Sequence, residues 1–217
     1  MTPLFSDMSR FRRRLRGLGE PLLHAALLVA LTLAIITVIG LARYYWPRSF
    51  LSGMPEAGDR EGMAALCAHP AARARQWEYI IVHHSATTGG SAAAFERYHV
   101  HKRHWDSLGY HFVIGNGTQT GDGEIEVGGR WRQQQIGSHA LGYNARGIGI
   151  CLVGNFSTQQ PSERQIQSLR TLVRYLCETY DIAPDRVIGH NECNGAQTAC
   201  PGRNLDVPAL REWLRTR

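Results

Sequence analysis

The feature that most constrains this 217-residue chain is an uncharged stretch near its N-terminus, residues 21–42. Within it, residues 25–41 read AALLVALTLAIITVIGL, which is apolar on every face of a helix and has no helical or alternating period. Twenty-two residues rising 1.5 Å each span about 33 Å, which matches a hydrocarbon core of about 30 Å. The stretch therefore predicts one N-terminal transmembrane helix.

Charge on the two sides of this stretch predicts its orientation. Five arginines precede it, whereas only Arg43 and Arg48 follow closely, so the positive-inside rule places residues 1–20 in the cytoplasm. The aromatic residues 44–46 supply a belt at the far interface. We therefore expect a single-pass protein of the inner (cytoplasmic) membrane, with the rest of the chain on the periplasmic, extracytoplasmic side.

Two alternatives compete with an uncleaved anchor. A cleaved signal peptide has a shorter apolar region that ends in a small-residue cleavage site, whereas RYYWPRSF follows the apolar run here. A buried core helix would carry polar residues along one face, and only His24, Thr32 and Thr37 interrupt the run. An uncleaved anchor fits both observations better than either alternative.

The net charge of +6 is unevenly distributed along the chain. Residues 1–50 hold seven Lys and Arg against two Asp and Glu, and residues 51–217 hold seventeen against sixteen. A nucleic-acid-binding domain carries its basic excess on the folded part, interleaved with aromatic residues. The near-neutral remainder of this chain therefore argues against a nucleic-acid partner.

After a linker over residues 43–76, which includes a short helical pattern around 61–68, residues 77–217 alternate between strand-like and helical segments. Strand patterns lie at 78–85, 109–117, 147–156 and 186–190, helical patterns at 91–104, 161–176 and 207–214, and a Gly-rich hairpin region at 121–131. This order predicts a single α/β domain with a central mixed β-sheet flanked by helices.

Candidate metal ligands follow the predicted strands. His83 and His84 stand where YIIV ends, His190 stands where RVIG ends, and Cys200 lies in the loop TACPG. Two imidazoles and a thiolate suit Zn²⁺, and three protein ligands leave the fourth tetrahedral position for water. Hydrogen-bonded histidines and a buried cysteine are the alternative, because ten histidines place some near strand ends by chance.

Four segments, VHHSAT, GYHFVIGNGT, GSHALGYNARGIGICLVGNF and GHNECNGAQTACPG, occur in this order. They resemble the successive motifs of zinc-dependent N-acetylmuramoyl-L-alanine amidases, the family of phage lysozyme-type amidases and peptidoglycan recognition proteins. The resemblance covers about residues 77–215. It implies a zinc hydrolase that binds the muramyl peptides of peptidoglycan and cleaves the amide between N-acetylmuramic acid and L-alanine.

The resemblance implies roles for individual residues. His83, His190 and Cys200 match the family's zinc ligands. Tyr110 matches a tyrosine placed near the zinc-bound water and the scissile carbonyl. Thr198 occupies a position where relatives carry Lys or Thr, which implies that it donates to the developing oxyanion. No covalent intermediate is needed, since zinc activates a water for the attack.

The resemblance also implies a substrate groove. His139 and Asn155 match positions that contact muramyl peptide. Cytosolic recycling amidases of the superfamily carry a glutamate where this chain has Cys151, which leaves the general base unassigned. Glu192 is not assigned to that role merely because it follows His190.

Two alternative functions remain open. A non-catalytic peptidoglycan-binding recognition module would keep the groove, but such relatives typically replace the cysteine of the ACPG motif, which here is Cys200. A phage-type endolysin with a releasable membrane segment would carry a segment richer in Ala and Gly than residues 25–41. We expect a monomer, and the pairing of the four cysteines outside the zinc group is open, with Cys67 and Cys193 as one candidate pair.

Overall fold

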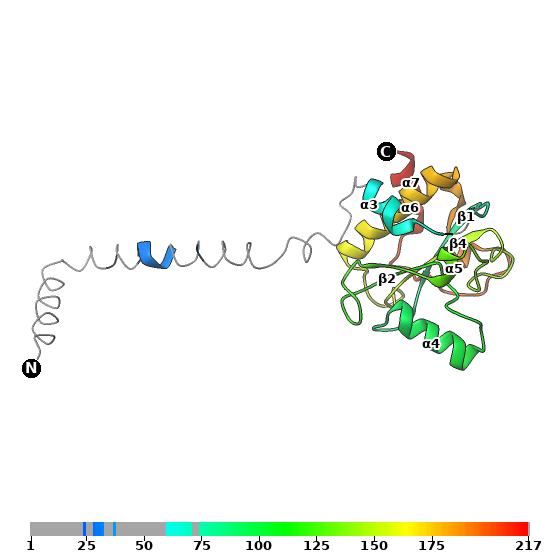
Figure 1. Cartoon of the computed structure of the whole chain (residues 1–217), viewed down its shortest axis with the longest axis horizontal. Coiled ribbons are helices and arrows are strands. Elements are labelled where there is room, and N and C mark those ends of the chain that lie inside the picture. The colour runs from blue at the N-terminus through cyan, green and yellow to red at the C-terminus, as the bar shows by residue number, and fades with distance from the viewer. Residues whose placement is uncertain (1–23, 25–27, 33–36, 38–59, 71–73, 217) are drawn as a thin grey trace, which may run out of the picture. The chain divides into compact units, whose positions relative to one another are not determined.

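A computed structural model describes residues 24, 28–32, 37, 60–70 and 74–216 of the chain (Figure 1). The chain divides into two compact units, Met1–Ser52 and Gly53–Arg217. The second unit contains the α/β domain that the strand and helix patterns predict.

The predicted transmembrane segment, residues 21–42, lies mostly outside the described residues. Its described residues, 24, 28–32 and 37, are helical, and the side chains of Leu28, Val29 and Leu31 are exposed. Within the part of the chain that the structure describes, no helix is both long and apolar enough to cross a bilayer. The anchor therefore remains a prediction from the sequence.

The domain is built on a five-stranded sheet with the order β3-β2-β4-β1-β5 (Figure 1). Parallel pairs join β1 to β4, β1 to β5 and β2 to β4, and β3 pairs antiparallel with β2 at one edge. The strands are β1 (Tyr79–His84), β2 (Phe112–Ile114), β3 (Ile125–Val127), β4 (Gly147–Leu152) and β5 (Val187–Gly189). The predicted central mixed sheet is confirmed.

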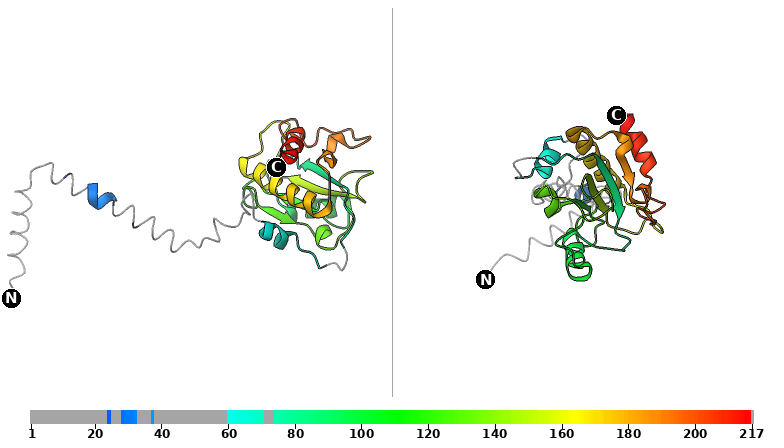
Figure 2. Two further views of the ribbon diagram at one scale, coloured as in Figure 1. Left: turned by 90° about the horizontal axis from the view of Figure 1, so that it is seen from above. Right: turned by 90° about the vertical axis from the view of Figure 1, so that its right-hand side faces the viewer.

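Helices cover both faces of this sheet. On one side lie α3 (Arg60–Cys67), α6 (Glu163–Tyr180) and α7 (Val207–Arg215), and α4 (Ala92–Arg103) lies on the other side (Figures 1 and 2). The predicted helices at 91–104, 161–176 and 207–214 are thus present. The four-residue α5 (Gly129–Arg132) lies within the region expected to be a hairpin. Two short 3₁₀ turns, Pro184–Arg186 and His190–Glu192, flank β5.

Helix α6 begins and packs as its sequence indicates. The Ser162 hydroxyl accepts a hydrogen bond from the backbone N–H of Gln165, and the Gln165 side chain accepts one from the Ser162 N–H, which forms a capping box. Its apolar residues at spacings of three and four form a buried stripe, Leu169, Leu172, Val173 and Leu176. The stripe packs into the main core, which lies between α6 and the sheet.

Alternation along β1 places its side chains on opposite faces. Ile80 and Val82 belong to the main core cluster with α6, whereas Ile81 belongs to a separate cluster. His83 follows the same alternation as Ile81 and therefore lies on the face away from α6. Its side chain is buried, with 1% exposure.

The folded domain begins earlier than the expected linker allows. Helix α3 lies inside the predicted linker, residues 43–76, yet Met63 and Cys67 are buried in the main core. The indole Nε1 of Trp131 donates a 2.8 Å hydrogen bond to the backbone oxygen of Cys67. Residues 60–67 therefore belong to the domain, because their burial contributes to its core.

All five cysteines are free thiols. Cys67 lies in the main core, whereas Cys193 lies in the cluster that contains Ile81. The pair that the sequence left as a candidate disulfide is therefore not formed in this structure.

Candidate metal centre

His83, His190 and Cys200 come together at one end of the sheet. Their ligand atoms all lie within 4.8 Å of one another. The Sγ of Cys200 is 3.6 Å from Nδ1 of His83, and the ring centroids of His83 and His190 are 4.6 Å apart. The three residues predicted as zinc ligands thus form one compact group.

The parallel pairing of β1 with β5 explains why the two histidines meet. Both strands run in the same direction, so their carboxyl ends lie at the same edge of the sheet. His83 lies near the end of β1, and His190 comes directly after β5. A sheet of this kind commonly places its ligand site at that edge.

Backbone hydrogen bonds hold the loop of Cys200 against these two strand ends. The N–H of Asn191 donates to the backbone oxygen of Cys200 over 2.8 Å. The N–H of His84 donates to Sγ of Cys200 over 3.3 Å. The second bond supplies a donor to the sulfur, which favours the thiolate that a metal ligand must be.

Gly202 allows the loop to approach the segment that follows β4. Its φ is +91°, and a Cβ at this position would lie 2.4 Å from the backbone carbon of Phe156. Any larger residue would push the loop outward. The motif ACPG therefore contains both the candidate ligand Cys200 and the glycine that lets the loop pack this closely.

The donor set suits a zinc ion. Burial lowers the pKa of His83 well below its usual value, with nearby His139, His190 and His84 adding to the effect, so its imidazole stays neutral. Burial also lowers the pKa of His190. Neutral imidazole is the form that binds a metal. Burial raises the pKa of the Cys200 thiol to about 12, so metal binding at neutral pH must displace its proton.

Tyr110 lies beside the metal ligands. Tyr110 lies two residues before β2. In the register of the sheet, Val113 of β2 pairs with Cys151 of β4, and Cys151 pairs with His83 of β1. These three side chains therefore lie in one row across the sheet. The Tyr110 ring centroid is 5.2 Å from that of His83, and Tyr110 packs against the small core cluster that contains Cys151. Burial raises the pKa of Tyr110 well above its usual value, so the phenol remains a hydrogen-bond donor throughout the physiological range.

Thr198 and Asn155 lie in the two loops that approach the metal ligands. The Oγ1 of exposed Thr198 accepts a 3.1 Å hydrogen bond from the N–H of Cys200. The Oδ1 of half-buried Asn155 accepts a 3.2 Å bond from the N–H of Ser157. The next residue, Phe156, donates its N–H to Nδ1 of His84 over 3.1 Å, which ties this loop to the end of β1.

His139 is placed differently from the predicted groove position. Its side chain is buried, its Nδ1 lies 3.0 Å from Nε2 of His83, and its Nε2 lies 3.2 Å from the backbone oxygen of Gly147. Neither ring nitrogen is free to contact a substrate in this arrangement. The contact with His83 is not predicted from the sequence, although the glycines at 137 and 149 indicate that a side chain approaches the backbone closely there.

The carboxylate of Glu192 is held by hydrogen bonds from Arg211 and Gly189. Its two carboxylate oxygens accept hydrogen bonds of 2.9 and 3.0 Å from Arg211, and one accepts a 2.6 Å bond from the N–H of Gly189. Partial burial would raise the pKa of Glu192, but these bonds lower it overall. Glu192 stays unassigned as a base. Among the described residues, the metal-ligand group contains no carboxylate.

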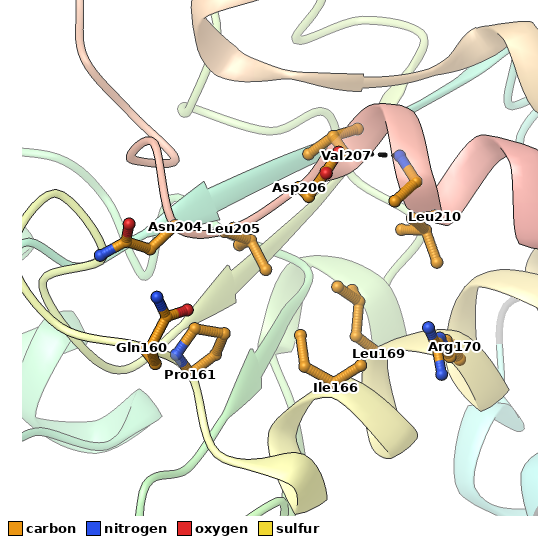
Figure 3. Close-up of a pocket in the computed structure, with 11 residues that line it drawn as sticks. Gln160, Pro161, Ile166, Leu169, Arg170, Asn204, Leu205, Asp206, Val207 and Leu210 are labelled. Carbon is orange, nitrogen blue, oxygen red and sulfur yellow. Dashed lines mark hydrogen bonds between the residues drawn. The ribbon is translucent and has the colours of Figure 1, made fainter.

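A separate pocket of about 220 Å³ opens between α6 and the start of α7. Figure 3 shows Ile166 and Leu169 of α6 facing Leu205 and Leu210 across it. None of the residues that line it is a predicted ligand, catalytic residue or groove residue. The candidate chemistry thus lies at the strand ends and not in this pocket.

Comparison with known proteins agrees with the geometry. The family model of N-acetylmuramoyl-L-alanine amidases matches residues 73–203. A mouse N-acetylmuramoyl-L-alanine amidase is 32% identical over 166 residues, which cover 71% of this chain and 29% of the mouse protein. A peptidoglycan-recognition protein of Drosophila simulans is 36% identical over 115 residues, which cover 52% of this chain and 58% of that protein. The match thus spans less than two thirds of either relative's own length.

Solved structures show the same likeness. The endolysin amidase LysCS from Clostridium intestinale superposes with a TM-score of 0.58 at 32% identity, over 65% of this chain and 85% of that one. Drosophila peptidoglycan recognition protein LB superposes with a TM-score of 0.53 at 26% identity, over 71% of this chain and 91% of that one. Through residues 73–203, the chain belongs to the N-acetylmuramoyl-L-alanine amidase family.

Proposed function

We propose that this protein is a zinc-dependent peptidoglycan amidase that hydrolyses the amide bond between N-acetylmuramic acid and the L-alanine of the stem peptide. The observation that carries the proposal is the complete ligand group His83, His190 and Cys200 in a chain of the amidase family. Zinc bound there would supply a Lewis acid that lowers the pKa of a water and polarises the lactyl carbonyl.

Two hydroxyl groups would stabilise the charge that develops on the carbonyl oxygen. Tyr110 stays protonated because burial raises its pKa, so it can donate without first taking up a proton. The Thr198 oxygen already accepts from the Cys200 N–H, which leaves its single hydrogen to be donated elsewhere. Both hydroxyls would thus be available as hydrogen-bond donors to the oxyanion.

Asn155 is proposed to contact the muramyl peptide. Its loop is fixed on one side by the bond from Phe156 to His84 and on the other by the close packing of Gly202. A rigid loop next to the metal ligands can position a substrate at low entropic cost.

A non-catalytic recognition module is the second candidate, because relatives of this chain include recognition proteins. One Drosophila relative, a variant of recognition protein LB, was solved in complex with tracheal cytotoxin. The complete ligand group favours catalysis, since a module that only binds does not need a partly buried thiol beside two imidazoles. A phage-type endolysin would perform the same chemistry, as the name of the Clostridium relative indicates.

We further propose that the enzyme works as a monomer at the outer face of the inner membrane, held by residues 21–42. The proposal is supported by the uncharged stretch and by the excess of arginine that precedes it. Residues 53–59 and the part of the linker before them would connect the anchor to the domain. The active site would then face the cell wall.

The test is to incubate the full chain, purified in detergent, with isolated sacculi and to analyse the soluble products by mass spectrometry. We expect free stem peptides that begin with L-alanine, together with glycan strands that carry unsubstituted lactyl groups. Cys200→Ser, which removes a thiolate ligand, is the matched control and should release neither. Binding of the wild-type chain to sacculi without release of peptide would favour the recognition module.

A further inference from the structure

A chain of hydrogen bonds runs from a backbone carbonyl through two buried imidazoles to the metal ligands. The oxygen of Gly147 lies 3.2 Å from Nε2 of His139, and Nδ1 of His139 lies 3.0 Å from Nε2 of His83. The remaining nitrogen of His83, Nδ1, lies 3.6 Å from Sγ of Cys200. Each nitrogen in the chain therefore has one defined partner.

Only one arrangement of protons on neutral rings satisfies this chain. A carbonyl oxygen can only accept, so Nε2 of His139 must carry the hydrogen. Nδ1 of neutral His139 is then an acceptor, so Nε2 of His83 must donate to it. Neutral His83 is left with its lone pair on Nδ1, the atom that faces Cys200.

A charged His139 would reverse the second bond, but its surroundings disfavour the charge. The ring is buried, and the partners of its two nitrogens are an imidazole and a backbone oxygen, not a carboxylate. A buried imidazolium with no anionic partner is unfavourable. The neutral arrangement is the one that the environment supports.

The fold makes room for this ring at two glycines. A Cβ on Gly137 would lie 2.3 Å from Cδ2 of His139, and a Cβ on Gly149 would lie 2.5 Å from the same atom. The Oδ1 of Asn144 accepts 2.8 Å hydrogen bonds from the N–H groups of His139 and Ala140. Both the ring and the backbone of His139 are thus held in place.

We propose that His139 is a positioning residue of the metal centre: it accepts the Nε2 hydrogen of His83 and so fixes the tautomer that presents Nδ1 of His83 to the metal. The inference rests on the proposed zinc site. His139 would then orient the ligand His83, whereas the resemblance implied a contact with the substrate. Histidines that bind metals commonly donate their second N–H to a carboxylate, a carbonyl or water. Here the imidazole of His139 accepts this bond, and its own Nε2–H donates to the backbone oxygen of Gly147.

The first test measures the tautomer directly in the metal-free wild-type chain. Nitrogen-15 NMR of labelled histidines distinguishes a ring protonated on Nε2 from one protonated on Nδ1. We expect both His83 and His139 to carry the hydrogen on Nε2. A His83 protonated on Nδ1 would overturn the inference and would leave the proposed zinc site standing.

The second test compares zinc affinity among variants by competition with a chelator. His139→Leu removes the acceptor and should weaken zinc binding 10–100-fold, as loss of such partners typically does. His139→Asn keeps an acceptor oxygen near the position of Nδ1 and should restore most of the affinity. The matched control is His111→Leu, because His111 is also buried and its ring lies 5.6 Å from that of His139. His111 bonds Gln135 and Gly149 and not the ligands.

The outcomes separate the two proposals. Loss of affinity in His139→Leu, with recovery in His139→Asn and no loss in His111→Leu, would support the inference. Equal losses in the two leucine variants would mean that His139 acts only through general packing and would overturn it. A wild-type chain that binds no zinc would overturn the proposed metal site. The tautomer measurement would still test the hydrogen bonds that join Gly147, His139 and His83.

Discussion

Nδ1 of His83 and Sγ of Cys200 lie 3.6 Å apart, although the two residues are 117 positions apart in the chain. The contact depends on β1, on the parallel pairing of β5 beside it, and on a loop that returns to both strand ends. Its chemical consequence is a thiol and an imidazole placed to share one cation.

Replacing Cys200 by serine should remove metal and activity together. A hydroxyl is a much poorer zinc ligand than a thiolate, so the loss of zinc affinity should exceed the 10–100-fold typical of an outer-shell partner. Metal analysis and muropeptide release measure the two effects on one sample. Cys177→Ser, on α6 and outside the ligand group, is the control. Full zinc occupancy in the Cys200 variant would refute its assignment as a ligand.

Tyr110→Phe should lower kcat by about 10²-fold, because it removes one donor to the developing oxyanion. Zinc content should stay at the wild-type level, since the tyrosine is not a ligand. Steady-state kinetics with a soluble muropeptide would separate kcat from KM. The exposed Tyr98 on α4 provides a tyrosine-to-phenylalanine control. A change in KM alone would show that Tyr110 only positions the substrate.

Thr198→Ala should act in the same direction as the tyrosine variant, but more weakly. The alanine variant loses a hydroxyl that both donates to the oxyanion and accepts from the Cys200 N–H. Thr198→Ser keeps the hydroxyl and should retain most of the activity. Comparing kcat of the two variants at equal zinc content checks the role, and equal kcat values would contradict it.

The stability of the metal-free domain should fall as the pH drops from about 6.5 toward 4. Burial lowers the pKa of His111 from 6.5 to about 4, so the unfolded chain binds a proton that the folded chain does not. The contribution is complete above pH 6.5 and is lost progressively below it, by about 3 kcal/mol in full. Urea unfolding at pH 7 and pH 5 in the presence of a chelator measures the change.

His111→Gln removes this titration and should reduce the pH dependence of unfolding. Part of the pH dependence should remain in the variant, because burial lowers the pKa values of His83 and His139 as well. An unchanged difference between pH 7 and pH 5 in the variant would show that His111 does not contribute.

Deleting residues 1–48 should abolish membrane association and leave hydrolysis of isolated sacculi intact. The proposed anchor, residues 21–42, is removed, whereas residues 60–67, which pack in the core, are retained. Fractionation and a reporter fused after residue 217 test the placement. A reporter that is active only in the cytoplasm would contradict the proposed topology.

Periodic segments could be read from the sequence, whereas packing between distant segments could not. The alternation in YIIVHH and the spacing of apolar residues in α6 predict β1 and α6 because each pattern extends over several residues. The four residues of α5 are too few to show a period. Helix α3 falls within the predicted linker because its short pattern shows no strong periodicity, although Met63 and Cys67 are buried in the core and Leu66 packs against it.

The same contrast between local patterns and packing of distant segments applies to the candidate metal centre. The candidate ligands His83, His190 and Cys200 follow strands or occupy a distinctive loop, so local patterns pointed to them, and the family resemblance selected His83 over the adjacent His84. The bond between His83 and His139 joins residues 56 positions apart and depends on how a loop folds over two glycines. The two glycines indicate a close approach there, but no local pattern identifies His83 and His139 as partners.

The most direct measurement of the central claim is zinc add-back to the chelator-treated full chain, followed by mass spectrometry of its products from sacculi. The account predicts that release of peptides beginning with L-alanine rises in proportion to added zinc and saturates at one zinc per chain. Equal release from the metal-free chain, or products cleaved within the glycan or the peptide, would contradict it.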